Sequence, residues 1–203
     1  MRIPSIEQCY LLMDKYGMLD NIRAHSVMVT RVADVLLAGL AKSPKVNGSL
    51  PLGDLVRAGA LLHDIAKTQC LKSRCDHARQ GRDICLEHGY QEVAEVVREH
   101  VVLAEFSPER YQRGHFLAKE IVYYADKRVR HDEIVTLEER LDYILEHYGN
   151  NDPARHSMIM ENFDKCKLLE NYILSTVDMG PEALTELVDR SPAKIAFKRP
   201  STI

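Results

Sequence analysis

Apolar residues recur at spacings of three and four along almost the whole chain, and no stretch alternates convincingly with a period of two. This pattern predicts an all-α fold. The expected helices cover residues 5–16, 20–41, 52–66, 76–88, 90–101, 117–130, 136–148 and 153–178, with a short helix over 181–189. Gly89, Gly149 and Gly180 support three of the helix ends.

Polar side chains interrupt the apolar stripes of five of these segments. His63 and Asp64 end the apolar stripe of the segment 52–66, and His25 lies in the seam of 20–41. Asp126 lies in an apolar stripe where only Arg130 is charged at a spacing of four. A single hydrogen-bonded core His-Asp pair would be the simpler interpretation if it stood alone. The whole inward-facing set is His25, His63, Asp64, His77, His100 and Asp126.

Six inward-facing polar residues on different helices indicate one common partner, because a buried carboxylate needs a strong partner. Neutral imidazole and carboxylate together suit a divalent ion such as Zn, Fe, Mn, Co or Ni. We therefore expect a metal cluster in the core. The chain has no P-loop and no GxGxxG motif, and its glycines are scattered.

The order His, His-Asp, His, His, Asp resembles the HD-domain metal-dependent phosphohydrolase superfamily. The resemblance covers residues 20–148. The matching pieces are His25 in Arg-Ala-His-Ser, His63-Asp64 in Leu-Leu-His-Asp-Ile-Ala-Lys, His77 in Asp-His-Ala-Arg-Gln-Gly, His100 in Arg-Glu-His-Val and Asp126 in Tyr-Tyr-Ala-Asp-Lys. The resemblance implies a single-domain helical bundle over residues 1–203, with a metal-binding core at 20–148 and a C-terminal helical extension and tail at 149–203.

By this resemblance two divalent ions (Fe, Mn, Co, Ni, Zn or Mg) are expected. His25, His63, Asp64 and Asp126 would hold the first ion, and Asp64 would bridge to a second ion held by His77 and His100. One departure concerns the second site: this chain reads His100-Val101 where some family members have two adjacent histidines.

The expected function is a metal-dependent phosphohydrolase, which cleaves the phosphate ester of a nucleotide or nucleotide-like substrate by a metal-activated hydroxide. Asp64 and Lys67 are the predicted catalytic residues. Lys67 shares a helical face with His63, and the resemblance favours a role in binding substrate phosphate over the alternative of a solvent lysine that closes a helix end. Arg130 is a second phosphate-binding candidate, on the expected Asp126 face. The alternatives are a mononuclear nucleotidase, a mixed-valent di-iron oxygenase and a non-catalytic nucleotide-binding module.

The charge composition limits the kinds of molecule that the protein is expected to bind. The net charge of −3 and the pI near 6.3 argue against extensive nucleic-acid binding, so a small phosphorylated substrate is expected. Positive charge gathers at Lys127, Arg128 and Arg130. Apolar runs look too short for a membrane span, and residues 1–20 contain charges, so a cytoplasmic protein without an anchor or signal peptide is predicted. It could form a homo-oligomer.

Two further expectations concern the cysteines and the chain end. Five cysteines form an odd set without paired spacing, so reduced thiols are expected, with Cys70 and Cys75 as packing or loop residues. The polar segment Glu105–Gly114 is expected to be a loop that either covers a pocket or simply connects two helices. The tail from Ser191 to Ile203 is expected to be partly ordered at best.

Overall fold

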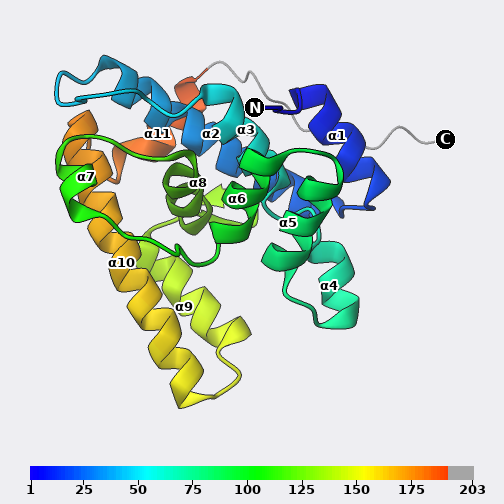
Figure 1. Cartoon of the computed structure of the whole chain (residues 1–203). Coiled ribbons are helices and arrows are strands. Elements are labelled where there is room, and N and C mark those ends of the chain that lie inside the picture. Colours follow the sequence, from blue (N-terminus) through cyan, green and yellow to red (C-terminus); the bar gives the residue numbers. More distant parts are fainter. Residues whose placement is uncertain (192–203) are drawn as a thin grey trace.

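The computed structural model describes residues 1–191, and the all-α fold class is confirmed (Figure 1). The helices are α1 (Ile6–Lys15), α2 (Asp20–Lys42), α3 (Gly53–Leu62), α4 (Lys67–Ser73), α5 (His77–Glu87), α6 (Gln91–Glu99), α7 (Pro108–Gln112), α8 (Ala118–Lys127), α9 (Leu137–Tyr148), α10 (Pro153–Val177) and α11 (Ala183–Arg190). Among the described residues, the strands are β1 (Val129–Arg130) and β2 (Glu133–Ile134), which form one small antiparallel pair. The predicted tail lies outside the described residues, except for Ser191.

The centre of the bundle is built from α2, α3, α6 and α8. Helix α3 packs against α2, α6 and α8, and α5 packs against α6. Two glycines permit the close approach: a Cβ on Gly59 of α3 would collide with Val96 of α6, and a Cβ on Gly81 of α5 would collide with Val97. Both glycines are buried, and this close packing brings the ends of α3, α5 and α6 together.

Helix α2 is the core helix of the fold. By length and composition alone it could cross a membrane, unlike the sequence expectation that all apolar runs are too short. More than half of its apolar window is buried against the rest of the protein, where Val29, Val32 and Leu36 are completely inaccessible. Burial of this kind is typical of a central helix in a globular core.

Helices α9 and α10 form a long hairpin whose tip projects from the rest of the bundle (Figure 1). Asp152 caps α10 by accepting hydrogen bonds from the amides of Ala154 and Arg155, and Pro153 occupies the first turn. Asp76 likewise caps α5, through the amide of Arg79.

Two predicted helices end earlier than the sequence indicates. The expected helix 52–66 ends at Leu62, and after a turn over residues 63–66 the short helix α4 begins, which the sequence analysis missed. The expected helix 117–130 ends at Lys127. Its next residue, Arg128, donates from its side chain to the carbonyl of Val135, and this contact directs the chain into the β1–β2 hairpin through a left-handed His131.

The segment 105–114 contains the short helix α7, which packs against α10. Tyr111 is buried in the core, and both Tyr111 and Arg110 donate hydrogen bonds to the fully buried Glu120 carboxylate. The segment is therefore fastened to the core instead of forming an open loop.

The expectation of five reduced cysteines is wrong, because Cys70 and Cys75 form a disulfide. Arg74 ends α4 in the left-handed conformation, which reverses the chain and brings the two Cα atoms to 4.7 Å. Nothing in the residue spacing shows this reversal. Cys9, Cys85 and Cys166 are free and buried.

Candidate metal centre

The six predicted ligands converge from five helices on one buried location. His25 comes from the first turns of α2, His63 follows the last residue of α3, and Asp64 lies in the turn behind it. His77 is the first residue of α5, His100 follows the last residue of α6, and Asp126 lies in the last turn of α8. Apart from His77, all of them are at most 6% exposed. Their role as ligands stays a prediction, but the structure brings all six together.

The first group consists of His25, His63, Asp64 and Asp126. The Asp126 Oδ1 atom lies 2.9 Å from His25 Nε2 and 3.6 Å from His63 Nε2. The Asp64 Oδ2 atom lies 3.5 Å from the same His63 nitrogen. His25, His63 and Asp64 have ligand atoms close enough together to hold one metal ion.

The second group consists of Asp64, His77 and His100. The other oxygen of Asp64, Oδ1, lies 3.4 Å from His77 Nε2 and 3.6 Å from His100 Nε2, and these two nitrogens are 3.2 Å apart. This trio can also hold one metal ion. Asp64 faces both groups with different oxygens, which is the arrangement that a bridging carboxylate requires.

Three of the histidines are oriented by backbone carbonyl groups. His63 Nδ1 lies 2.7 Å from the Ala60 carbonyl, and His100 Nδ1 lies 2.7 Å from the Val97 carbonyl, so each ring bonds to the last turn of its own helix. His25 Nδ1 lies 2.8 Å from the His131 carbonyl. A carbonyl can only accept, so Nδ1 carries a hydrogen in each ring, and Nε2 is the ring atom that faces the cluster, as a metal ligand requires.

The donor set has unsatisfied atoms that a cation would satisfy. His63 Nε2 and Asp64 Oδ1 are buried and have no hydrogen-bond partner within the described residues. Buried polar atoms without partners are costly, and two of them here face the same cluster of imidazoles and carboxylates. The residues present therefore fit a divalent ion.

The charges of the site also favour a cation. Burial opposes ionisation of Asp64, but the charges of Lys67 and His63 outweigh it and hold the pKa of Asp64 well below its usual value. Asp126 behaves in the same way: burial is outweighed chiefly by Lys127 and His25, and the pKa falls well below its usual value. Burial lowers the pKa of His25 and of His77, and it lowers that of His100 to about 4. Both carboxylates are thus ionised, and these three imidazoles are neutral, at neutral pH.

Lys67 stands beside the centre, but in a different position from the one predicted. It is the first residue of α4 instead of the last turn of a long helix, and its ammonium group donates to Asp64 Oδ2 at 2.7 Å. About a quarter of the side chain is exposed. The ammonium group therefore lies between the cluster and solvent.

Lys127 is a part of the site that the sequence analysis did not assign. Its ammonium group is buried and donates to Asp126 Oδ2 at 2.8 Å and to the His100 carbonyl at 2.9 Å, so it joins the two groups. It also lies 4.8 Å from the centre of the Tyr123 ring. Lys127 is adjacent to Asp126 in the chain and not four residues away on the same helical face; the signal in the sequence is the lysine that directly follows the aspartate.

The expected position of Arg130, on the same helical face as Asp126, is wrong. It assumed a helix as far as residue 130, but Arg130 lies on β1 and pairs with Glu133 at 3.8 Å. Arg128 points away from the cluster and is bound to Glu170 and Tyr124. Neither arginine has a described contact with the six candidate ligands.

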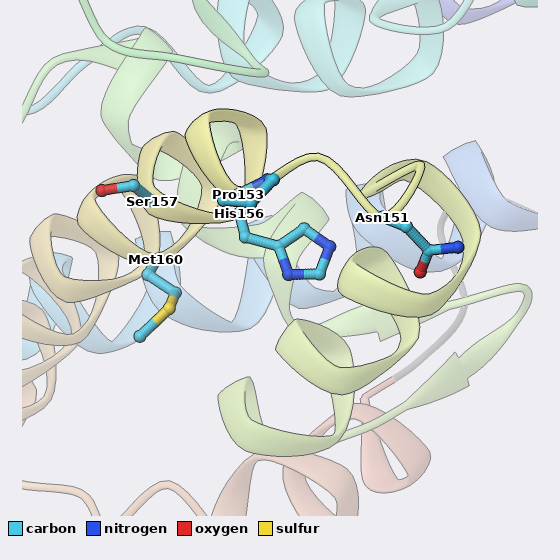
Figure 2. A pocket seen from close by; sticks show the side chains of 5 residues that line it. All are labelled: Asn151, Pro153, His156, Ser157 and Met160. Atoms are coloured by element: carbon cyan, nitrogen blue, oxygen red, sulfur yellow. The ribbon is translucent and has the colours of Figure 1, made fainter.

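An open cavity of about 490 Å³ lies away from these ligands, near the tip of the α9–α10 hairpin. Figure 2 shows its lining side chains on α10 and the preceding loop, which are Asn151, Pro153, His156, Ser157 and Met160. A second cavity, of about 240 Å³, is lined by residues 134–139, by Arg128 and Glu170, and by Pro181, Glu182 and Thr185. Neither cavity is lined by a candidate ligand.

The fold and the site define a helical protein with histidine and aspartate groups suited to divalent metal ions. The family model described as HD domain matches residues 22–152, and the chain belongs to this family, whose members form a superfamily of metal-dependent phosphohydrolases. The chain is also similar to the tRNA (cytidine(56)-2'-O)-methyltransferase of Thermoplasma volcanium (strain ATCC 51530 / DSM 4299 / JCM 9571 / NBRC 15438 / GSS1), with 30% identity over 149 residues. The alignment covers 69% of this chain and 41% of that relative, so the chain spans about two fifths of its length. No solved structure matches the chain.

Proposed function

We propose that the protein is a metal-dependent phosphohydrolase that cleaves a phosphate ester of a small nucleotide or nucleotide-like substrate at a dinuclear site. The observation that carries this proposal is the position of Asp64, whose two oxygens face two separate groups of nitrogen ligands. Two divalent ions bound there would supply Lewis-acid stabilisation of phosphate oxygens and an acidified water.

The chain's own residues would orient the substrate and keep the ligands in place. Lys67 is partly exposed beside Asp64, and its ammonium group can turn toward a substrate phosphate while remaining at the site. The carbonyl groups of Ala60 and Val97 hold His63 and His100 with Nε2 facing inward. Lys127 keeps the outer oxygen of Asp126 occupied, which leaves Oδ1 as the atom that faces the cluster.

Three observations separate this function from its alternatives. The three residues expected in the second group, Asp64, His77 and His100, lie close enough together to hold an ion, which favours a dinuclear site over a mononuclear nucleotidase. The cation of Lys67 at the rim favours an anionic phosphate substrate over a di-iron oxygenase. A non-catalytic nucleotide-binding module would not need six converging ligand side chains.

The relative's name refers to tRNA, and this widens the list of substrates worth testing. A phosphate at the end of an RNA is a monoester like that of a mononucleotide, and a cyclic phosphate from its cleavage is a diester like that of a cyclic nucleotide. The net charge of −3 favours a small substrate over a polynucleotide, since a nucleic-acid surface needs a broad basic face.

The test is a turnover assay on protein of measured metal content. Metal-free protein is loaded separately with Mn²⁺, Fe²⁺, Co²⁺, Ni²⁺, Zn²⁺ or Mg²⁺, and it is offered nucleoside monophosphates, cyclic nucleotides, RNA end phosphates and bis(p-nitrophenyl) phosphate. Release of phosphate or of the ester alcohol that depends on the metal and disappears in Asp64→Asn supports the proposal. Dioxygen consumption with iron, without hydrolysis of any ester, would replace it with the oxygenase.

A further inference from the structure

The disulfide between Cys70 and Cys75 lies between two residues of the metal centre. Lys67 begins α4 and His77 begins α5, and both side chains reach Asp64: Lys67 Nζ lies 2.7 Å from Oδ2 and His77 Nε2 lies 3.4 Å from Oδ1. The intervening segment therefore leaves the cluster and returns to the same carboxylate. The disulfide joins two residues of this segment, and its second cysteine lies two residues before His77.

The two sulfur atoms belong to different surroundings. Cys70 is 7% exposed and belongs to the hydrophobic cluster that contains Ile65 and Ala66, whereas Cys75 is exposed, together with its neighbours from residue 71 to residue 76. The bond therefore fastens the exposed start of α5 to the core. Cys75 is therefore the residue of the pair that a reagent in solution can approach.

Apart from the ion pair between Lys67 and Asp64 and the Asp76 cap of α5, the contacts that hold this segment are weak. Helix α4 has seven residues and no side-chain cap at its start, and Thr68 accepts one hydrogen bond from the Leu19 amide. The ion pair between Arg98 and Asp76 is 3.8 Å long and about half exposed, so it contributes little. The rest of α5 is held firmly against α6, which leaves its first turn as the part that the disulfide controls.

We propose that Cys70 and Cys75 form a redox-modification site for small-molecule thiols and disulfides, and that its state decides how firmly His77 is held in the second metal group. This inference rests on the second metal of the proposed function. In the disulfide state, His77 stays beside Asp64 and His100. After reduction, the first turn of α5 is free to fray, and the second group loses one of its three ligands.

The exchange balances with a thiol of the glutathione class as the reductant. One thiolate attacks the sulfur of the exposed residue Cys75, the Cys70–Cys75 bond breaks, and Cys70 leaves as a thiolate that takes up a proton. A second thiolate attacks the small-molecule sulfur of the mixed disulfide and releases Cys75, which also takes up a proton. Two electrons reduce the protein disulfide, and one small-molecule disulfide is the oxidised product.

The remaining cysteines would not compete in this exchange. Cys9, Cys85 and Cys166 are at most 1% exposed, and burial raises the pKa of each thiol to about 12. A thiol that is both buried and protonated is a poor nucleophile. The first metal group also stays outside the change, because its other ligands come from α2, the end of α3 and α8.

The experiment measures Mn²⁺ binding to the full-length protein in both redox states. Mn²⁺ is suitable because it prefers nitrogen and oxygen ligands and so avoids capture by the freed thiols. Metal-free protein is equilibrated with oxidised or reduced glutathione, freed of glutathione without air, and checked by intact mass. Equilibrium dialysis should give two Mn²⁺ per oxidised chain. Reduction should lower the affinity for the second Mn²⁺ by about tenfold or more and leave the affinity for the first unchanged. A tenfold loss is the size expected when a ligand loses a supporting contact.

Two variants test the cause. Cys70→Ser combined with Cys75→Ser should bind Mn²⁺ like the reduced protein whatever the glutathione state. His77→Ala should bind one Mn²⁺ in both states, because the ligand that the disulfide positions is already missing.

Unchanged affinity for two Mn²⁺ after confirmed reduction would overturn the inference. So would one Mn²⁺ in both states, or failure of the pair to form a disulfide in oxidised glutathione. Ester hydrolysis is assayed on the same samples. Hydrolysis by protein that binds one Mn²⁺ in both redox states would leave the proposed hydrolysis standing while this inference fails, and redox-dependent binding without hydrolysis would do the reverse.

Discussion

The two metal groups share Asp64 but differ in how the fold supports them. The other residues of the first group, His25, His63 and Asp126, lie on or directly at the end of mutually packed helices and are at most 6% exposed. The second group depends on His77, which is the first residue of α5 and follows an exposed loop. Its side chain is 29% exposed. A ligand held by the core is positioned by packing, whereas a ligand at a helix start needs a local constraint. The first group should therefore be the robust one.

The largest effect is expected from replacing Asp64, the residue that the two groups share. Asp64→Asn keeps the size of the side chain but removes the charge that faces both groups. We expect loss of both metal ions and of turnover to background, because two cations would remain without their bridging anion. Metal analysis and turnover on one preparation check this, with circular dichroism as the control for folding. Full turnover in this variant would remove Asp64 from the mechanism.

Equivalent deletions in the two groups should have unequal effects. His77→Ala and His100→Ala should each lower the metal content by about one equivalent and retain the first ion. His63→Ala should lose both, because the His63 ring is fully buried between the groups and its loss disturbs their common centre. The check is metal content against added metal. Equal losses in all three variants would show that the groups do not differ in strength.

The two lysines should separate substrate binding from support of the site. Lys67→Met should leave the metal content unchanged and slow turnover by about 100- to 1,000-fold, the typical cost of losing one contact to developing negative charge. Steady-state kinetics on the metal-loaded variant measure it. An unaltered rate would reduce Lys67 to a residue that pairs with Asp64 in the metal-free protein.

Lys127→Met should act on stability, and most strongly without metal. It leaves the buried Asp126 without its ammonium partner, a loss that costs about 3–5 kcal/mol for a buried pair. A bound cation would replace part of that interaction, so the metal-loaded variant should lose less. Urea unfolding of both forms measures the difference. Lys119→Met is the matched control, since its pair with Glu99 is more exposed and should cost about 1 kcal/mol or less.

The smallest effect expected is a difference in proton content between the groups in metal-free protein. Burial opposes protonation of His63, but Asp64 and Asp126 outweigh it and raise its pKa to about 9, whereas burial lowers that of His100 to about 4. The contribution of His63 to stability is thus fully present below its ordinary pKa of 6.5 and is lost as the pH rises through about 9. That of His100 is present above 6.5 and is lost as the pH falls to about 4.

Nitrogen-15 spectra of the imidazoles, recorded across this pH range, provide the measurement. At pH 7 the His63 ring should carry two protons and the His100 ring one. Matching titrations of the two rings near 6.5 would remove this difference between the groups.

The sequence by itself determined the fold class and the six residues of the cluster. Helical periodicity shows which face of each helix is buried, and a charged or imidazole side chain on such a face is visible without coordinates, as at His25 and Asp126. The order of these residues along the chain resembles that of the HD-domain family, and this resemblance assigned them to two metal groups. Local caps such as Asp76 and Asp152 were also predictable, because the cap depends on neighbouring amides alone.

Only the tertiary structure decided how the site is held together. The end of α3 at Leu62, the separate helix α4 and the hairpin after Lys127 depend on contacts between segments that are distant in sequence, and periodicity does not register them. The link from Lys127 to the His100 carbonyl and the closure of Cys70 on Cys75 are of the same kind. Periodicity reports which side of a helix faces inward, but the direction in which the chain leaves a helix end is set by the three-dimensional packing around that end.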